Sequence, residues 1–275
     1  MPWPTRTTYP TRQAYPTDLS DAEWDIVAPF LPRVTPSAHV AVTPTREIVN
    51  AIYYMKRTGT QWRNLPHDFP KWQLVAHYFY KWKKQRVWQS MNTALRQRVR
   101  EEAGRNAEPT AGSMDTQSVK TTEMGGERGF DAGKKIKGRK RGIVVDVLGL
   151  LITVVVVMAS MQESEVGRLL LPKARAEAPT LKKLWVDGGF TSKPLHADAA
   201  ASSFDLEIVK RPDDAKGFVL LPRRWVVERT FGWWNWERRL AKDFERQADT
   251  TETWVYITMC RIMSRRLAMT EQSEA

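Results

Sequence analysis

The sequence predicts an α/β protein in which a mixed sheet flanked by helices follows an all-helical region. Residues 18–105 carry apolar positions at helical spacing, whereas the chain after residue 110 contains short β-branched runs that alternate with helical segments. Strands that alternate with helices build α/β sheets. At 275 residues the chain can hold one large domain and one small one.

The N-terminal part divides into an arm and a helical region. Residues 1–17 are rich in Pro, Thr and Arg, and we expect an extended, poorly ordered arm. The helical region spans 18–105. Its first helix begins at Ser20, and Glu23 stands at the spacing of a capping box. Further helices are expected at about 45–57 and 71–102, with a proline-containing linker over 32–44 and a turn over 61–70.

The third helix is strongly basic. From Lys71 to Arg100 there are eight Lys or Arg residues and no acidic residue, and this run includes Lys81, Lys83 and Lys84. A charge run is often only a solvated face, but its interleaving with aromatic residues favours contact with phosphate. Short helices joined by tight turns are compatible with a helix-turn-helix-like module.

The C-terminal domain, 111–270, is expected to hold the sheet. A strand over 112–119 is followed by the basic segment 134–141 (KKIKGRKR), which we expect in a hairpin loop or at a strand edge. The β-branched runs 143–148 and 151–158 predict a buried antiparallel pair. The remaining expected elements are helices at 163–175 and 192–202, strands at 184–186 and 206–210, and helices at 223–240 and 250–268.

Three acidic residues stand at the ends of predicted elements: Asp115 in GSMDTQS, Asp187 in LWVDGGF and Glu228 in RRWVVERTFGW. Neighbouring strands would bring the two aspartates together, and the helix after the last strand would lay Glu228 across them. A buried carboxylate needs a partner or a metal. In a chain of formal net charge +12, converging carboxylates predict a site that holds two Mg²⁺ ions, or Mn²⁺ in their place, against phosphate.

Each of these acids alone has an ordinary alternative. Asp115 could be a turn or edge residue, and Asp187, which precedes two glycines, could simply start a turn. Glu228 could form an ion pair with Arg224, one helical turn earlier. Their order and placement together favour the metal site.

Other acidic residues have more ordinary expected roles. Asp146 interrupts an apolar strand, and a role at the hairpin edge fits it better than a role in the metal site. Asp131, Asp243 and Glu245 lie among basic residues, so we expect ion pairs for them.

Basic residues are candidates for contact with the DNA backbone, which positions a duplex without reading its sequence. The densest patch is Lys134, Lys135, Lys137, Arg139, Lys140 and Arg141, and Arg223, Arg224, Arg229, Arg238 and Arg239 flank the glutamate. Trp233, Trp234 and Trp236 follow one another too closely to share a face. At least one of them should be exposed, where it could stack on an unpaired base.

Several classes of protein are disfavoured. The most apolar stretch, 143–159, is interrupted by Asp146 and Gly149 and is too short for a spanning helix. A single cysteine, Cys260, excludes an internal disulfide and fits a reducing cytoplasm. We therefore expect a cytoplasmic protein, associated with the nucleoid when bound to DNA, and a packing role for Cys260.

The motifs resemble those of bacterial DDE transposases, close to the group named for insertion sequence five. The N-terminal segments LSDAEWDIVAPFLP and TREIVNAIYYMKRTGTQWRNLP are similar to that group's DNA-binding region. The later segments MDTQSVKT, GFDAGKKIKGRKRGIVVDVLGL, WVDGGF and RRWVVERTFGWWNWERRLAKDFE are similar to its catalytic domain.

This resemblance implies a ribonuclease H-like fold in which Asp115, Asp187 and Glu228 form a metal-binding triad. It also implies DNA cleavage and strand transfer at the inverted repeats that lie at the two ends of a mobile element. Because two double-stranded ends must be held together, a homodimer or larger assembly on DNA is expected.

The pattern around the glutamate departs from that of broader relatives, which often carry a tyrosine, an arginine and a lysine in a fixed frame. Arg224 fills the arginine place, whereas Leu221 and Asn235 stand where the tyrosine and lysine would be. Arg238 or Arg239 could supply the missing cation. Two other functions stay open, a metal nuclease on the same fold that does not join strands, and a DNA-binding regulator derived from a transposase.

Overall fold

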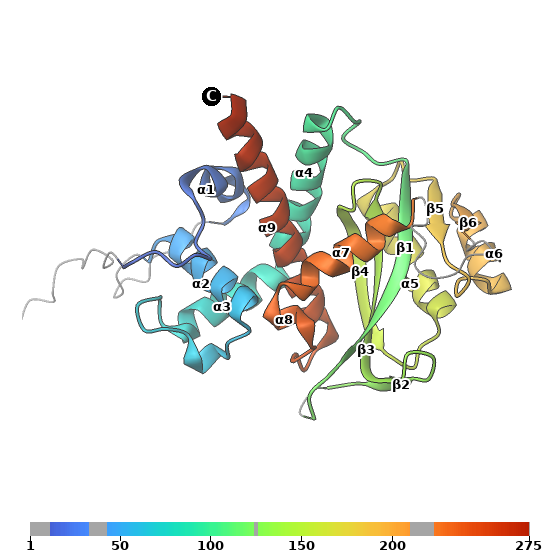
Figure 1. Cartoon of the computed structure of the whole chain (residues 1–275), viewed down its shortest axis with the longest axis horizontal. Helices are drawn as coiled ribbons and strands as arrows, with labels where there is room; N and C mark the ends of the chain where they lie inside the picture. The colour runs from blue at the N-terminus through green and yellow to red at the C-terminus, as the bar shows by residue number, and fades with distance from the viewer. Residues whose placement is uncertain (1–11, 33–42, 124–125, 210–222, 275) are drawn as a thin grey trace, which may run out of the picture.

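The computed structural model describes residues 12–32, 43–123, 126–209 and 223–274, which contain an N-terminal group of helices and a six-stranded sheet (Figure 1). The first eleven residues of the expected arm and most of the expected linker lie outside the described residues. Lys210, the last residue of an expected strand, lies outside them as well.

The helical region begins as the sequence predicts. Helix α1 spans Asp21–Val27, and its N-cap Ser20 and Glu23 form the predicted capping box. The short 3₁₀ turn η1 (Ala28–Phe30) follows it, and α2 spans Thr45–Thr58. Gly59, with φ of 72°, ends α2 in the left-handed conformation that glycine adopts without steric strain.

The prediction of a single long helix over 71–102 is wrong. After the 3₁₀ turn η2 (Trp62–Asn64), the chain forms two helices, α3 (Trp72–Lys84) and α4 (Val87–Glu102). Arg86 separates them with φ of 56° and ψ of 28°, a left-handed conformation that interrupts the helix. The break lets the two helices pack against each other. Trp82 and Trp88, one on each helix, lie buried with their ring centroids 6.0 Å apart.

The sheet combines antiparallel and parallel pairings. Its strands are β1 (Ala111–Lys120), β2 (Gly129–Asp131), β3 (Ile136–Asp146), β4 (Leu151–Met158), β5 (Lys183–Val186) and β6 (Asp205–Ile208). β3 pairs antiparallel with β1, β2 and β4, so the predicted hairpin 143–158 is confirmed. β5 lies parallel between β1 and β6. Four strands joined by antiparallel pairings, β1 to β4, and the two parallel strands β5 and β6 form the mixed sheet expected for a ribonuclease H-like domain.

Helices cover both faces of the sheet. They are α5 (Glu163–Glu177), α6 (Lys193–Ala201), α7 (Trp225–Asn235), α8 (Arg238–Ala241) and α9 (Ala248–Glu274). The helix expected over 223–240 is therefore two helices, with the break at Trp236 and Glu237. Apolar side chains of α5 and α6 form one core against the sheet, and those of α7 and α9 belong to a core on the opposite face.

The second core is shared with the N-terminal helices. Helix α9 packs against α1, α4 and β4, and in Figure 1 it lies between α1 and α4. Trp254 of α9 stacks on Phe79 of α3 with ring centroids 4.6 Å apart, and both side chains are buried. Cys260 is buried in the same core, which confirms its packing role. None of the helices in the described ranges is long and apolar enough to cross a membrane.

Candidate active site

The two aspartates lie at equivalent positions of neighbouring parallel strands. Ser113 of β1 is paired with Trp185 of β5, and each aspartate follows two residues later, Asp115 within β1 and Asp187 directly after β5. Because parallel strands in register end at the same edge of a sheet, the side chains converge there. This is the arrangement that the sequence predicts for them.

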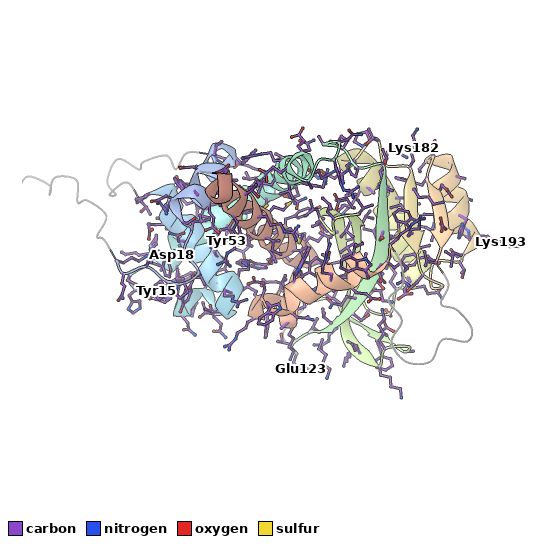
Figure 2. All side chains as sticks on the ribbon, turned by 45° about the horizontal axis from the view of Figure 1, so that its top comes forward. Tyr15, Asp18, Tyr53, Glu123, Lys182 and Lys193 are labelled. Carbon is purple, nitrogen blue, oxygen red and sulfur yellow. The ribbon has the colours of Figure 1, made fainter. Side chains whose placement is uncertain are left out.

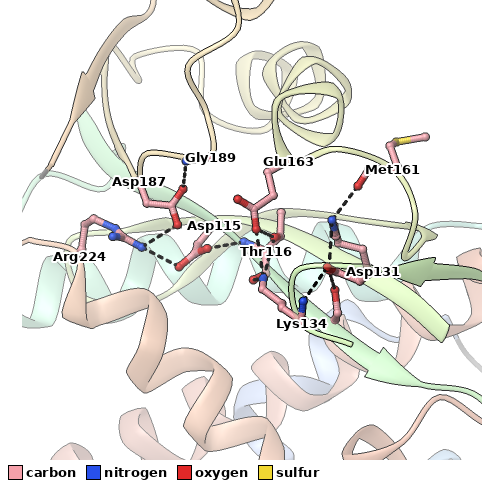
Figure 3. Close-up of polar contacts among 11 residues, drawn as sticks. Asp115, Thr116, Asp131, Lys134, Met161, Glu163, Asp187, Gly189 and Arg224 are labelled. Carbon is pink, nitrogen blue, oxygen red and sulfur yellow. Dashed lines mark hydrogen bonds and ion pairs between the residues drawn. The ribbon is translucent and has the colours of Figure 1, made fainter. Parts of the chain in front are cut away.

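A single guanidinium nitrogen joins the two carboxylates. Nη2 of Arg224 lies 3.1 Å from Oδ2 of Asp115 and 3.4 Å from Oδ2 of Asp187, as Figure 3 shows. Arg224 is the N-cap residue of α7 and its side chain is largely buried. The alternative in which Arg224 simply pairs with Glu228 along the helix is therefore wrong.

Asp115 is the more buried carboxylate of the pair. Its Oδ1 accepts a hydrogen bond of 2.6 Å from the backbone amide of Thr116. Burial, followed by repulsion from Asp187, raises the pKa of Asp115 to about 6, while Arg224 and the Thr116 amide act in the opposite direction. A cation that approaches Asp115 therefore stabilises the ionised form of its carboxyl group.

The donor set fits a hard divalent cation. Carboxylate oxygens are the protein ligands that Mg²⁺ and Mn²⁺ prefer. Asp115 and Asp187 direct one oxygen each at the same positively charged nitrogen of Arg224, so a cation is already accommodated between them. Asp187 uses its other oxygen, Oδ1, to accept a hydrogen bond of 2.8 Å from the amide of Gly189. This contact fixes the turn after β5, so Asp187 also has the turn role considered above.

Glu228 is not assembled with the aspartates. It lies in the first turn of α7, which packs against β1, and its side chain is exposed. Within the described residues Glu228 makes no ion pair, and no three acidic, histidine or cysteine side chains are close enough to hold one metal ion. The structure therefore brings together two members of the predicted triad, and the third lies on α7, one helical turn after Arg224.

A further carboxylate that the sequence reasoning missed lies beside this pair. Oε1 of Glu163, the first residue of α5, accepts hydrogen bonds of 2.9 Å from Oγ1 of Thr116 and 3.1 Å from Nζ of Lys134. The one available signal was its position at the start of the helix that follows the antiparallel strands.

Half of the predicted basic patch is not available to DNA. Lys134, Lys135 and Lys137 are exposed, whereas Arg139, Lys140 and Arg141 are buried in β3, whose two neighbouring strands and covering helices enclose them. The predicted DNA contact is therefore wrong for these three residues.

Each of the three buried side chains has a partner within the fold. Nη1 of Arg139 lies 3.3 Å from Oδ2 of Asp243, and Nη1 of Arg141 donates to the carbonyl oxygen of Leu240 at 2.7 Å. Nζ of Lys140 donates to the carbonyl oxygen of Met161 at 2.7 Å. The segment expected as a hairpin loop or strand edge is thus largely the interior of a central strand.

The other predicted DNA contacts divide in the same way. Arg239 is buried and forms an ion pair of 2.6 Å with Glu245, so it is not the substitute cation, whereas Arg238 is exposed. On α3, Nζ of Lys83 is bound by Asp249 at 2.6 Å. Lys84 is exposed, and Lys81 is half-buried with Nζ 5.5 Å from the centroid of the Tyr78 ring.

The competing acidic residues have the roles that the sequence predicts. Asp146 is fully buried, accepts hydrogen bonds from the amides of Leu148 and Leu150 in the hairpin turn, and forms an ion pair of 2.6 Å with Arg100. Ion pairs are also found for the three other acids, Asp131 with Lys140, Asp243 with Arg139 and Glu245 with Arg239.

One tryptophan near Glu228 is exposed, as predicted. Trp234 is fully buried, Trp233 is partly covered, and Trp236 leaves 73% of its surface exposed. Asn235, which stands in the lysine place, is exposed at the end of α7, and Leu221, in the tyrosine place, lies outside the described residues.

Two protein families match the sequence. Residues 19–92 match the family described as “Putative transposase of IS4/5 family (DUF4096)”. Residues 106–263, more than half of the chain, match the family described as “Transposase DDE domain”. The second match contains Asp115, Asp187 and Glu228.

Individual relatives are more distant. The uncharacterized protein y4sN of Sinorhizobium fredii is 29% identical over 77 residues, which make up 28% of this chain and 62% of that protein. The chain thus covers less than two thirds of the length of this relative. Crystal structures of the Mos1 mariner paired end complex with Mn and of the Mos1 strand transfer complex are 10% identical, with TM-scores of 0.31 and 0.30. Each similarity covers 84% of this chain and 80% or 79% of the Mos1 chain.

Proposed function

The chain belongs to the transposase DDE domain family, and on this premise we propose that it is the DNA transposase of a bacterial insertion sequence. In this proposal it binds the terminal inverted repeats of the element, cleaves the DNA strand at each end, and transfers the freed end to a target. Asp115, Asp187 and Glu228 are the proposed metal ligands.

One observation carries the proposal. Asp115 and Asp187, on neighbouring parallel strands, both lie within hydrogen-bonding distance of the same nitrogen of Arg224. Two carboxylates that converge on one cation at the edge of a sheet form a site of the kind that holds Mg²⁺ or Mn²⁺. Such ions supply activation of a water or a 3′ hydroxyl and stabilisation of the leaving oxygen in phosphoryl transfer.

Arg224 acts in this proposal as an internal counter-ion. Metal held by the carboxylates would repel its guanidinium, which would then be available to bind a DNA phosphate, for which its planar fork is suited. Arg224 and Glu228 lie at the two ends of the first turn of α7.

The proposed DNA surface consists of exposed basic residues around this edge of the sheet, within a chain of formal net charge +12. The members with exposed side chains are Lys134, Lys135, Lys137 and Arg238, and Lys84 extends the set on α3. Their ammonium and guanidinium groups would hold the duplex through its phosphates. Because two ends are joined in one reaction, we propose that a dimer or larger assembly forms on DNA.

A regulator without catalytic activity is the second candidate. It is favoured by one observation, the exposed position of Glu228 away from the aspartate pair. In that case the ion pairs of Arg224 would be the permanent state of the site.

A strand-transfer assay separates these functions. Duplexes that carry the element's inverted repeat next to flanking DNA are incubated with Mg²⁺ and a circular target, using the wild-type protein and Asp115→Asn. The transposase proposal predicts joined products for the wild type and none for the variant. Cut ends without joined products would identify a nuclease, and specific binding without either reaction would identify a regulator.

A further inference from the structure

The ammonium group of Lys134 lies beside the aspartate pair. Its Nζ donates to the carbonyl oxygen of Thr116 at 3.2 Å and to Oε1 of Glu163 at 3.1 Å (Figure 3). Thr116 follows Asp115 in β1, and its amide donates to the Asp115 carboxylate. Lys134 therefore contacts the residue that follows Asp115, the most buried acid of the site, and its charge lowers the pKa of Asp115.

The turn that carries Lys134 is held in place from within the fold. Asp131 accepts hydrogen bonds from the hydroxyl of Ser118 at 2.6 Å and from the backbone amide of Lys134 at 3.0 Å. It also forms an ion pair of 3.4 Å with the buried Lys140. These contacts fix the backbone of Lys134 against β1, so its side chain has a defined origin.

Glu163 fixes the other end of the lysine side chain. Its second oxygen, Oε2, lies so close to Gly189 that a Cβ atom at this glycine would be 1.7 Å away from it. The adjacent Ser164 also donates a hydrogen bond of 3.0 Å to the carbonyl oxygen of Gly189. The start of α5 is thus packed against the turn after Asp187.

Lys134 remains accessible despite these contacts, because 41% of its side-chain surface is exposed. The other cations near the pair are less suited to meet a substrate. Until metal binds in the proposed site, Arg224 is held by both carboxylates, whereas Arg139 and Arg141 are buried and Arg239 is paired with Glu245.

We propose that Lys134 is the cation that contacts the reacting DNA phosphate at the catalytic centre, with Glu163 and Thr116 as positioning residues that hold its ammonium group. The inference rests on the proposed function. An ammonium group fixed before the substrate arrives stabilises the negative charge that develops on the phosphate oxygens.

The first test separates this role from ordinary backbone binding. Lys134→Met is compared with wild type and with Lys182→Met, a control that removes an exposed lysine before β5, at the other end of that strand (Figure 2). Cleavage of an inverted-repeat duplex should fall on the order of 100-fold in Lys134→Met, as for loss of one preorganised donor. Lys134→Arg, which keeps the charge, should restore part of the rate, and Lys182→Met should cleave like the wild type.

Metal-free binding to a pre-nicked duplex provides a readout that does not depend on cleavage. In EDTA, the slope of log Kd against log salt concentration should fall by about one for Lys134→Met, as expected for loss of one phosphate contact. An unchanged slope together with unchanged cleavage would overturn the inference. So would equal losses of binding and cleavage, because Lys134 would then be a uniform binding contact.

Glu163→Gln tests the positioning role, since glutamine keeps an acceptor for Thr116 but loses the charge that holds Lys134. The expected result is a decrease in the rate at saturating DNA with little change in the KM for DNA. A change in KM alone would contradict it. If the wild type itself fails to cleave while the salt slope still depends on Lys134, the proposed function fails and the phosphate contact stands.

Discussion

At the scale of single residues, the central feature is the pairing of Arg224 with both Asp115 and Asp187. An arginine between two carboxylates compensates their repulsion in the metal-free protein, where an unpaired buried charge would be costly. In the proposed metal site, Arg224 and a divalent ion compete for one position. The affinity of that site for metal then depends partly on the ion pairs that must be broken.

This competition predicts that Arg224→Ala binds Mn²⁺ more tightly than the wild type, with a Kd lower by about tenfold, or roughly 1.4 kcal/mol. The measurement is titration of Mn²⁺ followed by the electron paramagnetic resonance signal of the free ion, without DNA. Arg168→Ala removes an exposed arginine paired with Asp198 and serves as the control. Equal or weaker binding by Arg224→Ala would contradict the competition.

Asp131 offers a pH-dependent test at the same scale. Desolvation opposes its ionisation, but the Ser118 hydroxyl, the Lys134 amide and Lys140 outweigh it and lower its pKa from 3.8 to about 2. A carboxyl with a lower pKa in the folded state stabilises the fold above its unfolded pKa and loses this effect as the pH falls.

Asp131→Asn should therefore be less stable than the wild type above pH 4, and the difference should shrink as the pH falls from about 4 to 2. Urea unfolding of both proteins across this range measures the difference in the free energy of unfolding. A difference that stays constant or grows towards pH 2 would show that ionisation of Asp131 does not stabilise the fold.

The residues of the site were only partly predictable from the sequence. Asp115 and Asp187 could be identified because Asp115 falls within a predicted strand and Asp187 ends a short apolar one, and pairing of neighbouring strands brings such positions together. The contacts of Arg224 could not be predicted from the sequence, since they depend on how α7 approaches the sheet. Glu163 was missed because its distance from Asp187 depends on the packing of α5 against the turn at Gly189.

At the scale of elements, polar contacts hold the sheet to the surrounding helices. Asp146 ends β3 with its carboxylate fully buried, where it accepts two backbone amides of the turn and pairs with Arg100 of α4. Removing one partner of such a buried pair leaves the other charge without compensation. The turn between β3 and β4 therefore also anchors the helical region.

Asp146→Asn should lower the free energy of unfolding by about 3–5 kcal/mol, as measured for broken buried ion pairs. Asp198→Asn is the matched control, because its pair with Arg168 is exposed and such pairs contribute only about 0–1 kcal/mol. Urea denaturation followed by tryptophan fluorescence measures both. Similar stability of the two variants would contradict the anchoring role of Asp146.

The elements that the sequence predicted well are those with a clear hydrophobic pattern, such as the hairpin 143–158 and the capped helix at Ser20. The basic half of β3 was misplaced because charged residues normally lie at the surface. Its partners Asp243 and Leu240 are about a hundred residues away in the chain, and only the folded structure brings them close. The break at Arg86 lacks the glycine or proline that would have indicated it.

At the scale of the whole molecule, the helical region and the sheet domain share one hydrophobic core. Helix α9 lies at the C-terminal end of the chain but packs against α1 and α4 (Figure 1). Trp82, Trp88 and Trp254 are all fully buried in this core. Helix α7, which carries Glu228, contributes to the same core.

A chain limited to residues 106–275 should consequently not fold as the full chain does. It would expose the apolar face of α9 and part of β4, and we expect it to bind a hydrophobic dye and to lose its near-ultraviolet circular dichroism. Cooperative thermal unfolding of the fragment at the Tm of the full chain would contradict the shared core.

The most direct test of the account is nicking of a labelled duplex that carries the element's own ends, with Mg²⁺, by the wild type, Asp187→Asn and Asp198→Asn. The account predicts nicking at the repeat boundary by the wild type and the control. Asp187→Asn should be slower by roughly 100-fold or more, because a metal ligand is lost, while DNA binding stays within about twofold. Equal nicking by Asp187→Asn would contradict the assignment of the active site, and absence of nicking by all three would contradict the transposase itself.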